Sequence, residues 1–199
     1  MAINLGEEGT GNIPSFTATA GNTSEVATVV VIPTYTNDEV SCIAHSKEFT
    51  ITVNPLPQID SFVETICEGQ PFTDITPVDE DDGVVPAGTT YSWEIASTSS
   101  SDITGGSSGS GTTIAGSVLQ NASNSPQNLV YTVTPTTIVG DESCEGADFT
   151  VTITVNPTAQ VNQPDNYEYC NGDITDIIFT TSNGGVAVSY THLRAHETP

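Results

Sequence analysis

Apolar and polar side chains alternate along several short runs of this chain. Residues 149–155 place an apolar side chain at every second position, with threonine between them. Residues 49–53, 91–95 and 129–133 show the same alternation. Strict alternation is typical of a strand with one buried face and one solvated face. No run has the apolar period of a three-turn helix, so the pattern predicts an all-β chain.

Stretches rich in turn-forming residues separate these runs, and residues 97–111 are dominated by serine and glycine. A unit of about 100 residues, built from short strands divided by turns, is the size of an immunoglobulin-like sandwich. We expect seven side chains to form the centre of its core: Tyr91, Trp93, Ile95, Tyr131, Val133, Val151 and Ile153.

Two halves of the sequence match each other at an offset of 102 or 103 residues. Ordered matches at a fixed period indicate repeated structural units. The matched segments are residues 41–42 with 143–144, 51–55 with 153–157, 67–69 with 170–172, and 73–75 with 175–177.

Proline marks the boundaries of these repeats, at Pro55 and at Pro157. It removes a ladder donor and holds the preceding residue in an extended conformation. We therefore predict one complete repeat at residues 55–156. Residues 1–54 would be the closing part of an earlier repeat, and residues 157–187 the opening part of a later one.

Residues 188–199 need separate treatment, because they resemble a translated sequencing adapter. This tail contains His192, Arg194 and His196, in a chain with only two Lys or Arg residues and three His. We treat the tail as an artefact and exclude it from the interpretation of the fold.

Composition supports the β prediction and excludes some functions. The chain has 31 Thr, 19 Val and 16 Ile but only 5 Leu, and β-branched residues favour strands. Two Lys and Arg against 25 Asp and Glu give a net charge of −23, which excludes a nucleic-acid partner and an anionic membrane surface. No stretch approaches the roughly 18 apolar residues of a transmembrane helix, so we expect no membrane insertion.

Several segments resemble the PKD-like repeats of Bacteroidetes surface proteins, which often end in a gliding-motility or type IX sorting domain. Residues 9–19 are similar to a recurring phrase of these repeats, residues 66–70 to their opening turn, and residues 130–135 and 151–157 to their closing strands. The resemblance implies tandem PKD-like β-sandwiches in a secreted stalk or adhesin. It brings no catalytic residues, since these phrases are structural.

The four cysteines recur with the repeat, one near the start of each unit and one before its last strand. A bond between Cys67 and Cys144 would close the complete repeat and leave Cys42 and Cys170 without partners. The first turn and the last hairpin of a seven-strand sandwich tend to lie at opposite ends, however, and a disulfide needs Cα atoms within about 7 Å. Free or differently paired thiols therefore stay open as the alternative.

Two further features are candidate ligand sites. The acidic run Asp79, Glu80, Asp81 and Asp82 could bind calcium, but it lacks the spacing of an EF-hand loop, and a solvated loop is the alternative. Trp93 could stack on a sugar, but its place in an alternating run favours a core position. No cofactor other than calcium is expected.

These observations lead to a structural hypothesis for the function. His45 is the one potential general base outside the excluded tail, and no nucleophile motif accompanies it. We expect a non-enzymatic spacer or adhesin stalk, extracellular or on a cell surface, whose partners are neighbouring repeats and a surface glycan or protein. The opening residues contain no signal peptide. The rival hypothesis is a glycan-binding accessory module of a larger secreted enzyme.

Overall fold

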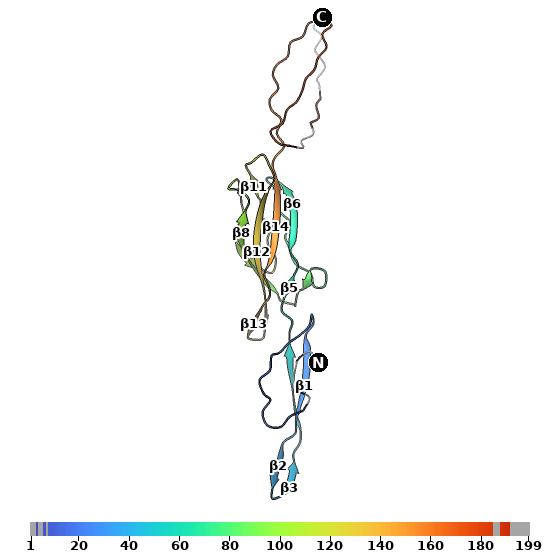
Figure 1. Ribbon diagram of the computed structural model, residues 1–199, viewed down its shortest axis with the longest axis vertical. Coiled ribbons are helices and arrows are strands. Elements are labelled where there is room, and N and C mark those ends of the chain that lie inside the picture. The colour runs from blue at the N-terminus through green and yellow to red at the C-terminus, as the bar shows by residue number, and fades with distance from the viewer. Residues whose placement is uncertain (1–2, 4–5, 7, 185–187, 192–199) are drawn as a thin grey trace.

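The computed structural model describes residues 3, 6, 8–184 and 188–191, and within them every regular element is a β-strand. Three parts lie end to end along an elongated molecule (Figure 1). They are the N-terminal part (residues 8–54), the central sandwich (residues 55–156) and the C-terminal part (residues 157–184). This confirms the all-β prediction. Most of the adapter-like tail lies outside the described residues.

The strands of the N-terminal part are β1 (Glu25–Val31), β2 (Thr34–Asn37), β3 (Val40–Ile43) and β4 (Lys47–Val53). Those of the central sandwich are β5 (Gln58–Ile59), β6 (Phe62–Cys67), β7 (Gly83–Val84), β8 (Thr90–Thr98), β9 (Ile103–Thr104), β10 (Gly109–Gly111), β11 (Gln120–Asn121), β12 (Gln127–Val139), β13 (Glu142–Glu145) and β14 (Phe149–Asn156). The predicted alternating runs all lie within strands, namely β4, β8, β12 and β14.

The central sandwich is built on one large sheet with the strand order β10-β8-β12-β14-β6, and β13 pairs with the far end of β12. Neighbouring strands are antiparallel except β14 and β6, which run parallel. Tyr131 of β12 therefore lies opposite Val151 of β14, which in turn lies opposite Phe62 of β6.

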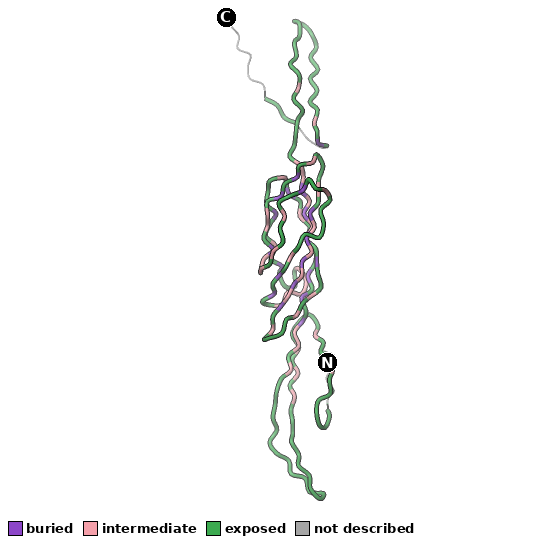
Figure 2. Tube along the Cα trace, turned by 90° about the vertical axis from the view of Figure 1, so that its left-hand side faces the viewer, coloured by how far each residue is buried: buried purple, intermediate pink, exposed green. Residues whose placement is uncertain are grey.

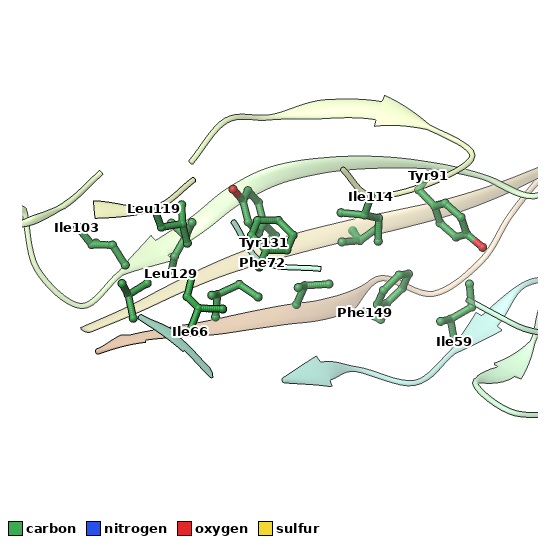
Figure 3. Close-up of a cluster of buried hydrophobic side chains, with 14 residues drawn as sticks. Ile59, Ile66, Phe72, Tyr91, Ile103, Ile114, Leu119, Leu129, Tyr131 and Phe149 are labelled. Atoms are coloured by element: carbon green, nitrogen blue, oxygen red, sulfur yellow. The ribbon is translucent and has the colours of Figure 1, made fainter. Parts of the chain in front are cut away.

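A thinner second layer covers one face of this sheet. Single bridges join Pro71 to Val118 and Ile75 to Ile114, and β9 pairs with β11. Phe72 of this layer places its ring 6.0 Å from the ring of Tyr131, centroid to centroid. The side chains enclosed between the layers are drawn in Figure 3, and they include Ile66, Phe72, Tyr91, Ile103, Ile114, Leu119, Leu129, Tyr131 and Phe149.

Five of the seven predicted core residues are buried, and two are not. Ile95 is 41 % exposed and Trp93 is only half-buried, although both point to the core face of β8. The serine- and glycine-rich stretch that passes over them supplies little side-chain cover. At Gly106, for example, the backbone lies so close that an added Cβ atom would stand 3.3 Å from the Ile95 side chain and 2.7 Å from that of Leu129, so no side chain fits there to extend the cover. The core prediction was therefore wrong at Ile95 and incomplete at Trp93.

The pairing in the N-terminal part reproduces that of the central sandwich. Val29 of β1 lies opposite Phe49 of β4, as Tyr131 lies opposite Val151, 102 positions later. The β2–β3 hairpin likewise matches the pairing of β12 with β13 at the same offset. Burial differs between them: the buried residues gather in the central sandwich, while the N-terminal hairpins are exposed or intermediate (Figure 2).

The core of the central sandwich predicts a large difference between two truncations. Ile153 is fully buried in β14, whereas Val63 on the outer face of β6 is 76 % exposed. Ile153→Ala should lower the free energy of unfolding by about 2–5 kcal/mol, because a cavity remains where the side chain packed. Val63→Ala should change it by less than about 0.5 kcal/mol. Urea unfolding followed by Trp93 fluorescence measures both, and equal effects would contradict the assigned core.

Candidate functional site

The lower joint connects the N-terminal part to the central sandwich through a short proline-rich segment. Pro55 and Pro57 are both buried, and each fixes its own backbone φ angle. The Ser24 hydroxyl donates a hydrogen bond to the side-chain oxygen of Asn54 at 2.7 Å, which joins the start of β1 to the end of β4. The chain therefore enters the sandwich with few free dihedral angles.

The upper joint is held by Glu68, just after β6. Its backbone N–H donates to the carbonyl of Asn156 at 2.9 Å. Its carboxylate accepts hydrogen bonds from the backbone N–H of Thr158, at 3.2 Å, and from the Thr158 hydroxyl. Glu68 thus ties the first residues beyond the sandwich to the end of its first long strand.

Asn183 fastens the same exit segment from the C-terminal side. It is 5 % exposed, its amide nitrogen donates to the carbonyl of Thr158 at 3.2 Å, and its amide oxygen accepts from the N–H of Gln160 at 2.9 Å. Pro55 and Pro157 indicated both joints from the sequence. The roles of Glu68 and Asn183 could not be predicted, because each depends on a contact with a residue more than 20 positions away.

The acidic loop uses two of its four carboxylates to hold its own backbone. Asp79 accepts from the N–H of Val85 and Asp82 accepts from the N–H of Val78, both at 2.8 Å. Glu80 adopts a φ of 70°, so the chain reverses sharply within the run. Asp81 is exposed to solvent. The loop is therefore a capped turn.

This geometry gives the calcium hypothesis no support. Within the described residues, no group of three or more His, Cys, Asp or Glu is placed to hold a metal ion. Calcium requires six to eight oxygen ligands around one point. We assign no cation site to Asp79, Glu80, Asp81 and Asp82.

Asp82 also affects a buried tyrosine of the core. Tyr91 is 3 % exposed, and burial raises the pKa of its hydroxyl above the usual value near 10, with the negative charge of Asp82 raising it further. Both effects disfavour the tyrosinate in the folded protein.

Trp93 is integrated into the sheet and is not a free platform. Its indole nitrogen donates to the carbonyl of Ser107 at 3.2 Å, and its ring lies directly over Gly109 of the neighbouring strand β10. A Cβ atom at Gly109 would stand 2.5 Å from the ring, so only glycine fits there. A sugar-stacking role for Trp93 has no support in this arrangement.

The predicted disulfide between Cys67 and Cys144 is wrong for this fold. All four cysteines are free. Cys67 lies opposite Asn156 at one end of the sheet, and Cys144 lies opposite Thr137 near the other end. About eleven strand positions separate them, which is roughly 35 Å at about 3.3 Å per residue. The two cysteines lie near opposite ends of the sandwich, which is the alternative given in the sequence analysis.

Comparison with known proteins finds a family resemblance in the central sandwich. Residues 64–159 match the family model of the PKD-like domain. The match begins within β6 and ends just beyond β14, so it covers most of the large sheet together with Glu68 and Thr158 of the upper joint. PKD-like domains are typically extracellular structural modules without catalytic activity. Neither the curated proteins nor the solved structures gave a match.

The described residues include no helix long and apolar enough to cross a membrane.

The raised pKa of Tyr91 predicts a loss of stability at alkaline pH. The unfolded chain gives up this proton near pH 10, while the folded chain holds it to a higher pH, so unfolding becomes more favourable as pH rises above about 10. Tyr91→Phe should flatten this part of the stability profile. Tyr35→Phe, at a residue 71 % exposed, is the matched control and should leave the profile unchanged. Thermal unfolding measured between pH 8 and pH 11 distinguishes them, and identical slopes in all three proteins would refute the prediction.

Proposed function

We propose that this chain is a non-enzymatic spacer from an exported surface protein, in which PKD-like sandwiches follow one another as tandem repeats. The observation that carries the proposal is the recurrence of the same strand register at an offset of 102 residues, with a proline-marked joint on each side of the central sandwich. A spacer needs rigid units and restricted joints, and the buried core of the central sandwich and the buried prolines of the lower joint support this role.

The joints support an extended arrangement. At the lower joint, buried prolines limit rotation, and at the upper joint Glu68 and Asn183 hold Thr158 from two sides. Each joint therefore has fewer accessible conformations than a flexible linker rich in glycine and serine would have. The three parts accordingly lie in line (Figure 1).

The charge of the chain supports the same role. A net charge of −23 makes neighbouring units repel one another, which favours extension and solubility over collapse. Threonines occupy the outer face of the large sheet, including Thr132, Thr150 and Thr152, where they hydrate a surface that would otherwise be apolar. The spacer's expected neighbours are further repeats of the same kind.

A glycan-binding module is less well supported. The one tryptophan of the chain packs against Gly109 and donates its indole N–H to the carbonyl of Ser107. An open hollow of about 460 Å³ at the lower joint contains no aromatic side chain, being lined by Asn22, Thr23, Gln58, Asp60, Asp79, Glu80, Gly83 and Val84. Adhesion to a surface glycan or protein would be an additional property of the spacer.

The spacer proposal predicts that Glu68 controls the extension of the molecule. Glu68→Ala removes both carboxylate contacts to Thr158, so the C-terminal part should sample more directions and the radius of gyration should fall. Glu64→Ala is the matched control, since Glu64 makes similar contacts to Thr73 within the sandwich. That variant should keep the full extension.

Small-angle X-ray scattering on dilute protein, directly after size-exclusion chromatography, measures this effect. A compact wild-type molecule, or an equal change in both variants, would contradict the spacer proposal.

A further inference from the structure

The entry segment, residues 55–60, leads the chain into the central sandwich as a short extended strand. Burial alternates along it: Pro55, Pro57 and Ile59 are buried, and the residues between them are exposed. Within this segment β5 pairs with β7, and the N–H of Asp60 donates to the carbonyl of Asp82 at 2.9 Å. The loop that carries the acidic run therefore lies along the entry segment, at the end of the sandwich beside the N-terminal part (Figure 1).

Two glycines lie against consecutive carbonyl groups of the entry segment. A Cβ atom added at Gly83 would stand 3.2 Å from the carbonyl carbon of Gln58 and closer still to its oxygen. A Cβ atom added at Gly146, in the turn between β13 and β14, would stand 2.9 Å from the carbonyl carbon of Pro57 and closer still to its oxygen. Consecutive carbonyls of an extended chain point to opposite edges. The two glycines therefore contact the entry segment from both edges, and neither position has room for a side chain.

The close approach of Pro57 is what requires glycine at position 146. The N–H of Gly146 donates to the carbonyl of Pro135 at 2.9 Å, and in the matching turn 102 positions earlier the N–H of Ala44 donates to the carbonyl of Pro33 at 3.0 Å. This turn therefore accepts alanine. The φ angle of Gly146 is not in the left-handed region either, so its backbone conformation does not demand glycine.

The acidic run holds the other glycine in place. The carboxylate of Asp79 accepts from the N–H of Val85, and that of Asp82 accepts from the N–H of Val78, so the two bonds close the turn from both sides of Gly83. Gly83 itself has a φ of 114°, which a residue with a side chain rarely adopts. The two carboxylates thus stabilise the conformation that brings Gly83 against the entry segment.

We propose that Gly83 and Gly146 form an entry clamp, which fixes the direction in which the chain enters the central sandwich. Asp79 and Asp82 are positioning residues of this clamp, so the acidic run has a structural role at the lower joint. The direction of the preceding unit is then set by loops of the sandwich that follows it.

The entry clamp deepens the spacer proposal, but the two can fail separately. A compact wild-type molecule in solution scattering would contradict the spacer role. The clamp is tested by local measurements on the entry segment, which do not depend on the overall extension of the molecule.

The first test removes the two positioning carboxylates from the full chain. In the double variant Asp79→Ala/Asp82→Ala, the amide of Asp60 should exchange about tenfold faster relative to the amide of Val151, because two side-chain-to-backbone hydrogen bonds of the loop are lost. Native-state hydrogen exchange followed by NMR at neutral pH measures both amides in the same sample, and the Val151 amide reports any change in global stability.

Asp81→Ala is the matched control, because Asp81 is an exposed carboxylate of the same run. It should leave the exchange of Asp60 relative to Val151 unchanged. An unchanged ratio in the double variant, or an equal change in the control, would overturn the positioning role of Asp79 and Asp82.

The second test measures the direction of the entry segment. Spin labels are attached to cysteines introduced at Leu56 and at Thr98, two exposed positions in the entry segment and at the far end of β8, after the native cysteines are replaced by serine. Pulsed electron resonance gives the distribution of distances between the labels. The protein with Gly146 should give one narrow distribution. Gly146→Ala should shift or broaden it, because the new Cβ atom displaces Pro57.

Gly116→Ala is the control for this second test. A Cβ atom there would overlap the carbonyl of Phe72 within the second layer, so the variant disturbs packing to a similar degree away from the entry segment. It should keep the narrow distribution. An unchanged distribution in Gly146→Ala, or the same change in Gly116→Ala, would overturn the entry clamp. The first test leaves both glycines in place, so it decides the matter if Gly146→Ala prevents folding.

Discussion

The antiparallel pairing of β12 with β14 is the interaction on which the rest of the structure depends. Its register puts Tyr131 beside Val151 on one face and Thr132 beside Thr150 on the other, so one ladder separates the core from the solvated surface. β8 and β6 extend this ladder on its two sides, and the second layer covers its apolar face. Because both joints begin where this ladder or its counterpart ends, it also sets the axis along which the units follow one another.

The N-terminal part shows that the ladder alone does not make a core. β1 and β4 keep the register of β12 and β14, yet Val31 and Phe49 stay half-exposed, whereas Phe72, Ile114 and Leu119 help to cover the ladder of the central sandwich. An isolated two-stranded hairpin is at best marginally stable in water. The cover supplied by the second layer is therefore what turns such a ladder into a core.

Much of this could be predicted from the sequence, because alternation over β4, β8, β12 and β14 reports directly which face is buried. Contacts made by irregular segments could not be predicted in this way, because they follow no such pattern. Ile95 looked like a core residue, but the stretch above it consists largely of glycine and serine, which supply little cover. Cys67 and Cys144 recur with the repeat, but recurrence carries no information about distance, and the sheet register separates them. Glu68 acts through Thr158, 90 residues away, and no local pattern marks such a pair.

The central claim is that cover, and not strand pairing, decides the stability of these two ladders. Native-state hydrogen exchange measured residue by residue tests it most directly, since it reports the opening free energy of each amide. In dilute protein, amides of β12 and β14 should exchange only through global unfolding, whereas those of β1 and β4 should open at a much lower free energy. Equal protection of the two ladders at high dilution would contradict the account.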